Sequence, residues 1–257
     1  MLRIIACFKW VVDDADIKMD AASRKLIFDR VGFKISEYDR NAIEEATRVR
    51  EQYGGTVAAV TVAPPSAKQC LKDVLSRGPD TAWFINDSSF SDLEPSQTAS
   101  ILAETLKSKI EYDLIICGEG SGDIYAQQVG PALAEKLGIP CATCVNKLTY
   151  VENEKRIIAE RKLEEIIEVV SIPLPALVTV LPDINSPRIP TLKQVLGAAK
   201  KPVRNVTLES LGKAPGACLQ TTGILATIMN RRRLRFTADA EGIHSAVDAL
   251  LKEGIIS

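Results

Sequence analysis

The stretch "YDLIICGEGSGDIYAQQVGPALAEKLG", residues 112–138, decides the fold class of this chain. Residues 112–118 form a short apolar run typical of a buried strand, and residues 126–138 carry apolar side chains at helical spacing up to a closing glycine. The segment between them holds Gly118, Gly120 and Gly122. A buried strand that leads through a glycine loop into a helix is the building unit of a parallel α/β sheet.

The N-terminal half repeats this order of strand and helix. Strand-like runs and helical periods alternate at residues 3–8, 36–54, 56–63, 66–78, 81–86 and 94–110. Ser36 stands where the first helix needs an N-cap. The alternation predicts an α/β fold with a mostly parallel, doubly wound, Rossmann-like sheet that helices cover on both faces.

The C-terminal part has a different pattern. Residues 146–172 contain β-like runs with turn signals at 151–156 and 162–165, which predicts a β-hairpin region near 145–172. Residues 175–183 are apolar enough to rejoin the main sheet. Residues 184–203, with three prolines and a basic cluster, predict an exposed loop and a short helix; the chain is then loop-rich to about 235, before an amphipathic helix at 240–254. We therefore expect an α/β domain over residues 1–183 and a loop with an extended C-terminal arm over 184–257.

Composition excludes several classes of function. The chain has 257 residues with a formal net charge of −1, which argues against nonspecific nucleic-acid binding. No apolar run approaches the roughly 20 residues that span a bilayer, and the first apolar run lacks a cleavage-like site, so we expect a cytoplasmic protein. A single histidine argues against histidine-dependent catalysis and metal sites. Cys141 and Cys144 form the only close cysteine pair, whose role stays open.

The glycine loop has two interpretations that its residues alone do not separate. Backbone N–H groups before a helix can cradle a phosphate, or the glycines can simply permit a tight turn. It is not a dinucleotide fingerprint, because Asp123 stands where the last glycine belongs and the fingerprint normally follows the first strand. It is not a Walker loop, because the Lys-Ser/Thr pair is absent.

Six blocks carry a resemblance to a known family: "ACFKWVVD", "KISEYDRNAIEEA", "KDVLSRGPD", "CGEGSGDIYAQQVGPALAE", "SIPLPA" and "DINSPRIPTLKQVLGAAKKPV". In this order they resemble the β subunit of electron transfer flavoproteins, and most closely its FixA branch. The resemblance covers essentially the whole chain. It implies a core like that of adenine nucleotide alpha hydrolases, and a flavin-dependent electron carrier without catalytic residues of its own.

The resemblance also implies a nucleotide site at the carboxyl ends of the strands. The loop would wrap the phosphates, Cys7, Lys9 and the start of the first helix would border the adenosine, and the end of the second strand would touch the adenine. The residues implied are Cys7, Lys9, Ser36, Tyr38, Asp39, Val62, Ala63, Gly118, Gly120, Ser121, Gly122, Asp123, Gln127, Gln128 and Val129. Two of these have a plain structural alternative: Asp123 could only cap the following helix, and Tyr38 could only pack in the core.

The ligand is an adenine nucleotide in either version of the family, AMP in simple carriers and FAD in electron-bifurcating members. Ile124 and Tyr125 depart from the family pattern, because many family loops have small or acidic residues directly after the aspartate. The Gln128–Pro131 continuation resembles the loops of bifurcating and FixA-type members, which favours FAD over AMP. The partners implied are a FixB-like α subunit, clasped by the C-terminal arm, and an acyl-CoA dehydrogenase-like reductase. Leu192 would be the apolar plug toward this reductase, with Lys200 and Lys201 as steering charges.

Two rival functions share the predicted core. A stand-alone adenine-nucleotide sensor of the universal-stress-protein type would bind the nucleotide without electron transfer, but the long C-terminal arm argues against it. An adenylating or amide-hydrolysing enzyme lacks its signature loop here. The hypothesis from the sequence is therefore an electron carrier subunit, with bifurcation and crotonobetainyl-CoA reduction as further roles associated with FixA relatives.

Overall fold

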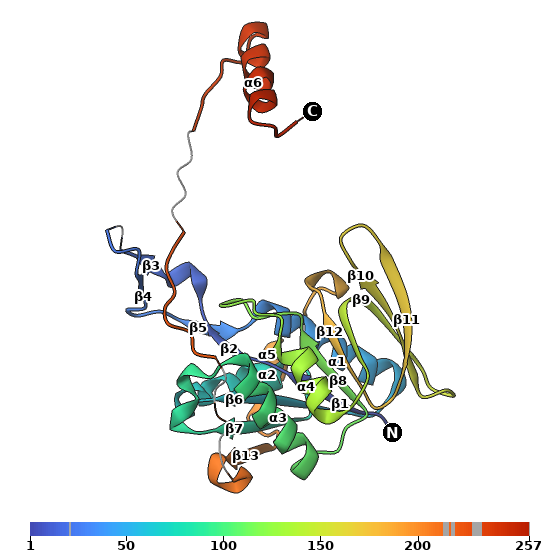
Figure 1. The fold of residues 1–257 in the computed structure, drawn as a ribbon. Coiled ribbons are helices and arrows are strands. Elements are labelled where there is room, and N and C mark those ends of the chain that lie inside the picture. Colours follow the sequence, from blue (N-terminus) through green and yellow to red (C-terminus); the bar gives the residue numbers. More distant parts are fainter. Residues whose placement is uncertain (21, 213–215, 217–218, 228–232, 257) are drawn as a thin grey trace. The chain divides into compact units, whose positions relative to one another are not determined.

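The computed structural model describes residues 1–256 except 21, 213–215, 217–218 and 228–232 (Figure 1). Contacts divide the chain into two compact units, one of Met1–Lys18 with Ile27–Gly223 and one of Met19–Leu26 with Ile224–Ser257. Within the described part of the chain, every helix is too short or too polar to cross a membrane.

The larger unit is built on a nine-stranded sheet with the order β11-β10-β9-β12-β8-β1-β6-β7-β13. Strands from β9 through β12 to β13 pair in parallel, and β9, β10 and β11 pair antiparallel as two hairpins. The strands are β1 (Arg3–Cys7), β6 (Thr56–Ala63), β7 (Thr81–Asn86), β8 (Leu114–Gly118), β9 (Cys141–Val151), β10 (Arg156–Lys162), β11 (Ile167–Pro173), β12 (Ala176–Val180) and β13 (Val203–Thr207). The expected mostly parallel α/β fold, with its hairpin region and with residues 175–183 back in the sheet, is confirmed.

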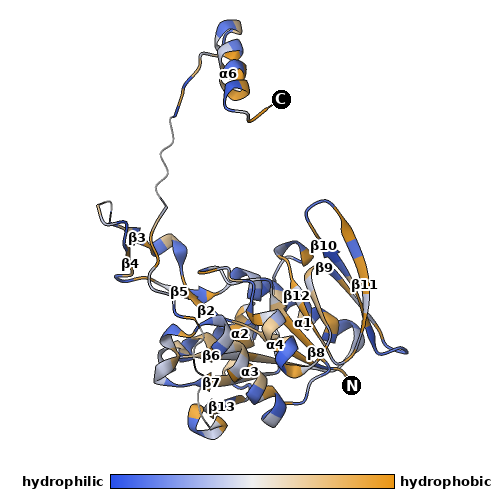
Figure 2. Cartoon of the chain, in the orientation of Figure 1, coloured by the Kyte–Doolittle hydropathy of each residue, from blue (hydrophilic) through white to orange (hydrophobic). Residues whose placement is uncertain are grey.

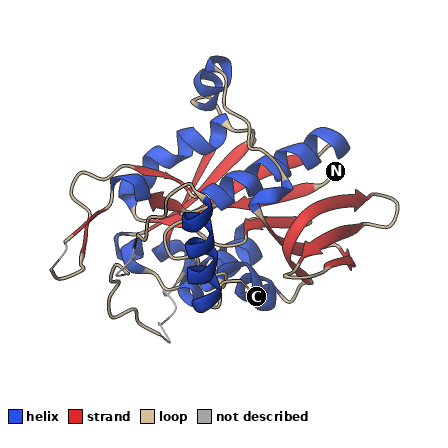
Figure 3. Ribbon diagram, turned by 90° about the horizontal axis from the view of Figure 1, so that it is seen from above, coloured by secondary structure: helices blue, strands red, loops and turns tan. Residues whose placement is uncertain are grey.

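Helices cover both faces of this sheet, which forms the middle layer in Figure 3. The helices of this unit are α1 (Glu37–Tyr53), α2 (Cys70–Ser76), α3 (Pro95–Lys109), α4 (Val129–Leu137) and α5 (Leu192–Ala198). Alternate residues of β1 separate the two cores: Ile4 and Ala6 pack with α1 and α2, whereas Ile5 packs with α3 and α4. The central strands are accordingly the most hydrophobic part of the chain in Figure 2.

Four short strands separate β1 from α1 in the sequence. After β1 the chain forms β2 (Trp10–Val12), which pairs antiparallel with β5 (Phe33–Ile35), and between them lie the short strands β3 (Lys18–Met19) and β4 (Leu26–Ile27). The β5 strand leads directly into α1. The N-terminus of α1 is thereby held beside the ends of β1 and β8.

One part of the sequence analysis was wrong. It placed no strand between residues 203 and 235, but β13 extends the sheet beside β7. The periodicity of β13 is weak because it is an edge strand in which only Val206 is buried. The larger unit accordingly continues to Gly223, past the functional boundary expected at residue 183, which stays a prediction.

The smaller unit contains the predicted C-terminal helix, α6 (Ala240–Lys252). The Asp239 carboxylate accepts the N–H of Gly242 at 2.7 Å and caps its N-terminus. Ile243, Val247 and Leu251 are exposed residues of α6.

Candidate functional site

The predicted site residues come together where β8, β1 and β6 end. These strands are neighbours in the sheet, and Gly118, Lys9 and Ala63 stand at or just beyond their carboxyl ends. The carboxyl edge of an open parallel sheet is where such folds bind ligands. The structure thus gathers, at one edge, residues from segments far apart in the sequence.

Asp39 ties two of these strands together. Its Oδ2 accepts the backbone N–H of Lys9 at 2.8 Å, and its Oδ1 accepts that of Gly118 at 3.2 Å. Burial raises the pKa of this carboxyl to about 7, although the two N–H groups favour the ionised form. Asp39 therefore changes its charge near neutral pH while it holds the end of β8 against α1.

Gly118 permits this close approach. A Cβ at position 118 would lie 2.6 Å from Asp39 Oδ1 and 2.8 Å from the backbone carbonyl carbon of Tyr38. Gly120 has a similar role, since a Cβ there would lie 2.4 Å from the ring of Tyr125. Gly122 has open space around it.

The sharp turns of the loop do not use these glycines. The left-handed backbone positions are Tyr125, with φ 51°, and Gln127, with φ 57°, both costly for a residue with a side chain. One of the two interpretations of the sequence was that the glycines only permit a tight turn. Gly118 and Gly120 instead leave room for neighbouring groups.

Lys9 and Asp123 form an ion pair across the loop, with Nζ and Oδ2 2.7 Å apart. Asp123 also accepts the N–H of Ile124 at 2.9 Å. Burial acts to raise the pKa of Asp123, but hydrogen bonds from Lys9 and Ser121 outweigh it and hold this pKa below its ordinary value. Because α4 begins only at Val129, with Gln128 as its N-cap residue, Asp123 does not cap this helix. Its contacts organise the loop.

Ser36 and Tyr38 connect α1 to the same loop. Ser36 occupies the predicted N-cap position of α1, but its hydroxyl makes no capping bond and instead accepts the N–H of Gly122 at 3.2 Å. The rings of Tyr38 and Tyr125 pack with centroids 5.0 Å apart. Tyr38 therefore contacts the loop through the ring of Tyr125.

Several backbone N–H groups of the loop remain free to bind a ligand. Those of Gly120, Ser121, Gln128 and Val129 donate to no residue that the structure describes. Gln128 and Val129 stand at the N-terminus of α4, where the helix dipole adds partial positive charge. Free N–H groups beside a helix N-terminus suit a phosphate, so these residues fit a nucleotide.

The sequence analysis missed Glu119, which supports the loop from inside. Its buried carboxylate accepts the Gln127 side-chain amide at 2.7 Å, the Cys144 backbone N–H at 3.1 Å and the Cys144 thiol at 3.2 Å. Cys144 has φ 58° where β9 bulges against β12. The signal in the sequence was a glutamate directly after an apolar strand.

Three predicted residues meet the site in a limited way. The buried Cys7 side chain packs in the core with residues of α3 and α4, so only its backbone faces the strand ends. Val62 and Ala63 end β6 with their side chains packed in the two cores. Their backbone is what a ligand can reach.

The predicted docking segment lies on the exposed loop before and along α5. Leu192 is 75% exposed and begins α5, after a Thr191 cap, and Lys200 is exposed beyond its end. Lys201 differs, because its ammonium donates to the carbonyls of Leu75, Gly78 and Pro79 at the end of α2 at 2.8, 3.3 and 2.7 Å. Lys201 therefore holds α2 in place, a contact that the sequence does not reveal.

One comparison bears on this geometry. The family model for the electron transfer flavoprotein domain matches residues 25–211, which include α1, the glycine loop and the hairpin region.

Proposed function

The chain belongs to the electron transfer flavoprotein domain family, and from this premise we propose that it is the β subunit of a FixA-type electron transfer flavoprotein. Members of this family are flavin-binding electron carriers that act as paired subunits. The six sequence blocks, in their order, support the β subunit over the α subunit. The carrier would pair with a FixB-like α subunit.

The observation that carries the proposal is the set of free N–H groups in the loop at the strand ends. Lys9, a cation that contacts the loop, is already paired with Asp123. A phosphate here would therefore be held mainly by backbone dipoles and the α4 N-terminus. Such a cradle suits the phosphate of a nucleotide.

We propose FAD as the resident nucleotide, with AMP as the alternative, because both contain the same adenosine monophosphate half. When bound, FAD supplies the redox chemistry of its flavin ring. The chain would hold its phosphates between Gly120 and Val129, its ribose beside Ser36 and Asp39, and its adenine against the backbone of Val62 and Ala63. Lys9 and Asp123 would keep the loop in shape.

Two surfaces support the proposed partners. The exposed apolar residues of α6, among them Ile243 and Val247, suit a C-terminal arm that clasps the α subunit. The exposed Leu192 on its proline-framed loop suits a contact with an acyl-CoA dehydrogenase-like reductase. Bifurcation and crotonobetainyl-CoA reduction are finer versions of the same role.

Co-expression with the α subunit and chromatography of the acid-released nucleotides tests the proposal. Two FAD per heterodimer, without AMP, would support a flavin in this chain. One FAD and one AMP would make the complex a simple carrier and overturn the FAD assignment. A stable chain that forms no complex and retains no nucleotide would overturn the β-subunit assignment itself.

A further inference from the structure

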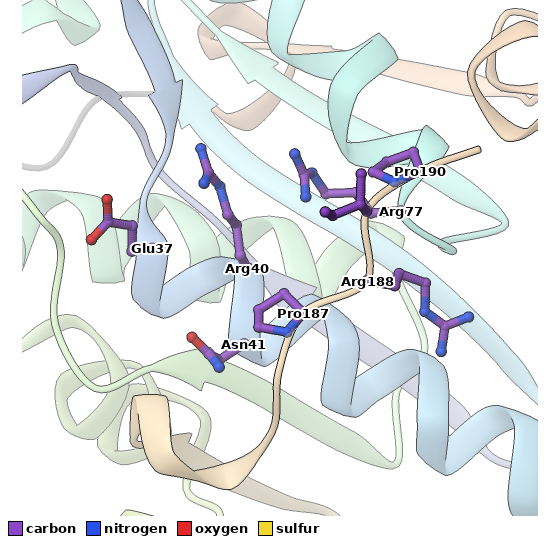
Figure 4. A pocket seen from close by; sticks show the side chains of 8 residues that line it. Glu37, Arg40, Asn41, Arg77, Pro187, Arg188 and Pro190 are labelled. Atoms are coloured by element: carbon purple, nitrogen blue, oxygen red, sulfur yellow. The ribbon is translucent and has the colours of Figure 1, made fainter. Parts of the chain in front are cut away.

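A pocket of about 370 Å³ lies between α1, the residue after α2 and the loop at 187–190. Figure 4 shows the side chains of Arg40 and Arg77 extending to the same side of this pocket, with Pro190 beside Arg77. The pocket is separate from the glycine loop, since none of residues 118–129 lines it.

The arginines of the pocket differ in how their charge is balanced. Arg188 is paired twice, with Glu44 at 2.7 Å and Glu51 at 2.7 Å. Arg77 donates from Nε to Asp73 at 2.9 Å. The side chain of Arg40 has no hydrogen-bond or ion-pair partner among the described residues, and its Nε atom is buried.

A buried guanidinium nitrogen without an acceptor is unfavourable, and an acceptor that enters the pocket would relieve this cost. The carboxylate that lines the pocket, Glu37, is paired with Lys34 at 2.9 Å, so among the described residues Arg40 is the one pocket arginine without a carboxylate partner. One free guanidinium suits one carboxylate rather than a polyphosphate. Guanidinium groups bind carboxylates through two parallel hydrogen bonds, which makes Arg40 a specific receptor for an acidic side chain.

The surroundings of the pocket favour a protein as the source of this carboxylate. Ile189 lines the pocket and is 90% exposed, and Leu192 and Leu196, 75% and 63% exposed, follow on the same segment. Apolar residues around an arginine are typical of the centre of a protein interface. A free small anion would leave these side chains in water.

We propose that Arg40 receives an aspartate or glutamate side chain of the reductase that docks on Ile189, Leu192 and Leu196. The inference rests on the proposed docking role of this loop. It adds a charged anchor that would fix the orientation of the reductase, while the leucines supply apolar contact.

Arg40→Gln in the co-expressed complex tests the anchor. We expect the KM for the reductase to rise about tenfold with kcat unchanged. Arg40→Lys should show a smaller rise, and raising the salt concentration should weaken the wild type more than Arg40→Gln. Arg156→Gln, which removes the same charge at the start of β10 beside Ser171, is the matched control and should stay within about twofold.

Dye reduction and bound-nucleotide content, measured on the same samples, separate the two hypotheses. Both should be unchanged in Arg40→Gln, because Arg40 touches no part of the glycine loop. A KM within twofold of wild type, while Leu192→Ser weakens binding, would overturn the anchor alone. Unchanged binding in both variants would overturn the whole docking surface. Loaded wild-type complex that does not reduce the reductase would overturn the proposed partner and this inference with it.

Discussion

The close approach of α1 to the end of β8 can be tested by comparing the stabilities of Gly118→Ala and Gly122→Ala. The added methyl at 118 would lie 2.6 Å from the Asp39 carboxylate and 2.8 Å from the backbone of Tyr38, where ordinary contacts need about 3.5–4.0 Å. Backbone on one side and a buried carboxylate on the other leave little room to relax. Overpacking of this kind costs about 1–3 kcal/mol, and a weakened hydrogen bond from the Gly118 N–H to Asp39 adds about 1–2 kcal/mol.

Gly122→Ala has no such cost, because nothing lies within 4 Å of its added methyl. It should be neutral or stabilising by up to about 1 kcal/mol, through loss of freedom in the unfolded chain. The gain from the unfolded chain is common to both alanines, so we expect Gly118→Ala to be about 2–5 kcal/mol less stable than Gly122→Ala. Urea unfolding followed by the fluorescence of Trp10 and Trp83 gives both values. Equal stabilities would refute the close packing of α1 on β8 and the role given to Gly118.

Three further predictions concern the charges and the docking loop. Lys9→Met should weaken nucleotide retention more than the double change of Lys9→Met with Asp123→Asn, because the single change leaves the Asp123 charge unpaired beside the phosphates. Asp123→Ala alone should weaken retention by about 1–3 kcal/mol. Tighter retention in Asp123→Ala would contradict the organising role of Asp123. The pKa of Asp39 is raised to about 7 in the folded chain, so between its ordinary pKa and pH 7 the folded chain binds a proton that the unfolded chain has lost. The free energy of unfolding should therefore fall as pH rises from 5 to 7, by up to about 2 kcal/mol more than in Asp39→Asn, and parallel profiles would disprove the shift. Leu192→Ser should weaken binding to the reductase about tenfold in a surface-binding assay, whereas Ile167→Ser, an exposed residue of β11, should not.

The strands and helices of the core could be predicted because their patterns are local. Residues 114–117 and 57–60 are apolar throughout, and α1 and α4 end at Gly54 and Gly138. The weak strand β13 could not be predicted, because only Val206 is buried and its pairing with β7 depends on the finished sheet. A strand that forms mainly through pairing with a neighbouring strand has only a weak hydrophobic pattern in its own sequence.

The residues of the candidate site could be predicted from the sequence, but their hydrogen-bond partners could not. As expected, the site brings together Lys9, Ser36, Asp39 and Asp123. The Ser36 hydroxyl, however, accepts the N–H of Gly122 and does not cap α1. The roles of Glu119 and Lys201 depend on contacts with Cys144 and with the end of α2, which only the fold brings near. Such contacts between distant segments have no local signal.

The backbone that precedes the predicted docking segment, at residues 182–188, is held by hydrogen bonds within the chain. The Asn41 amide donates to the carbonyls of Pro182 and Asn185 at 3.0 and 2.8 Å, and Asn185 in turn donates to Glu45 at 2.9 Å. Together with the paired Arg188, these bonds order the backbone below Ile189 during folding. Much of the conformational entropy of this surface is therefore lost when the chain folds and not when a partner binds. Encounters with the proposed reductase could then be brief and still well oriented.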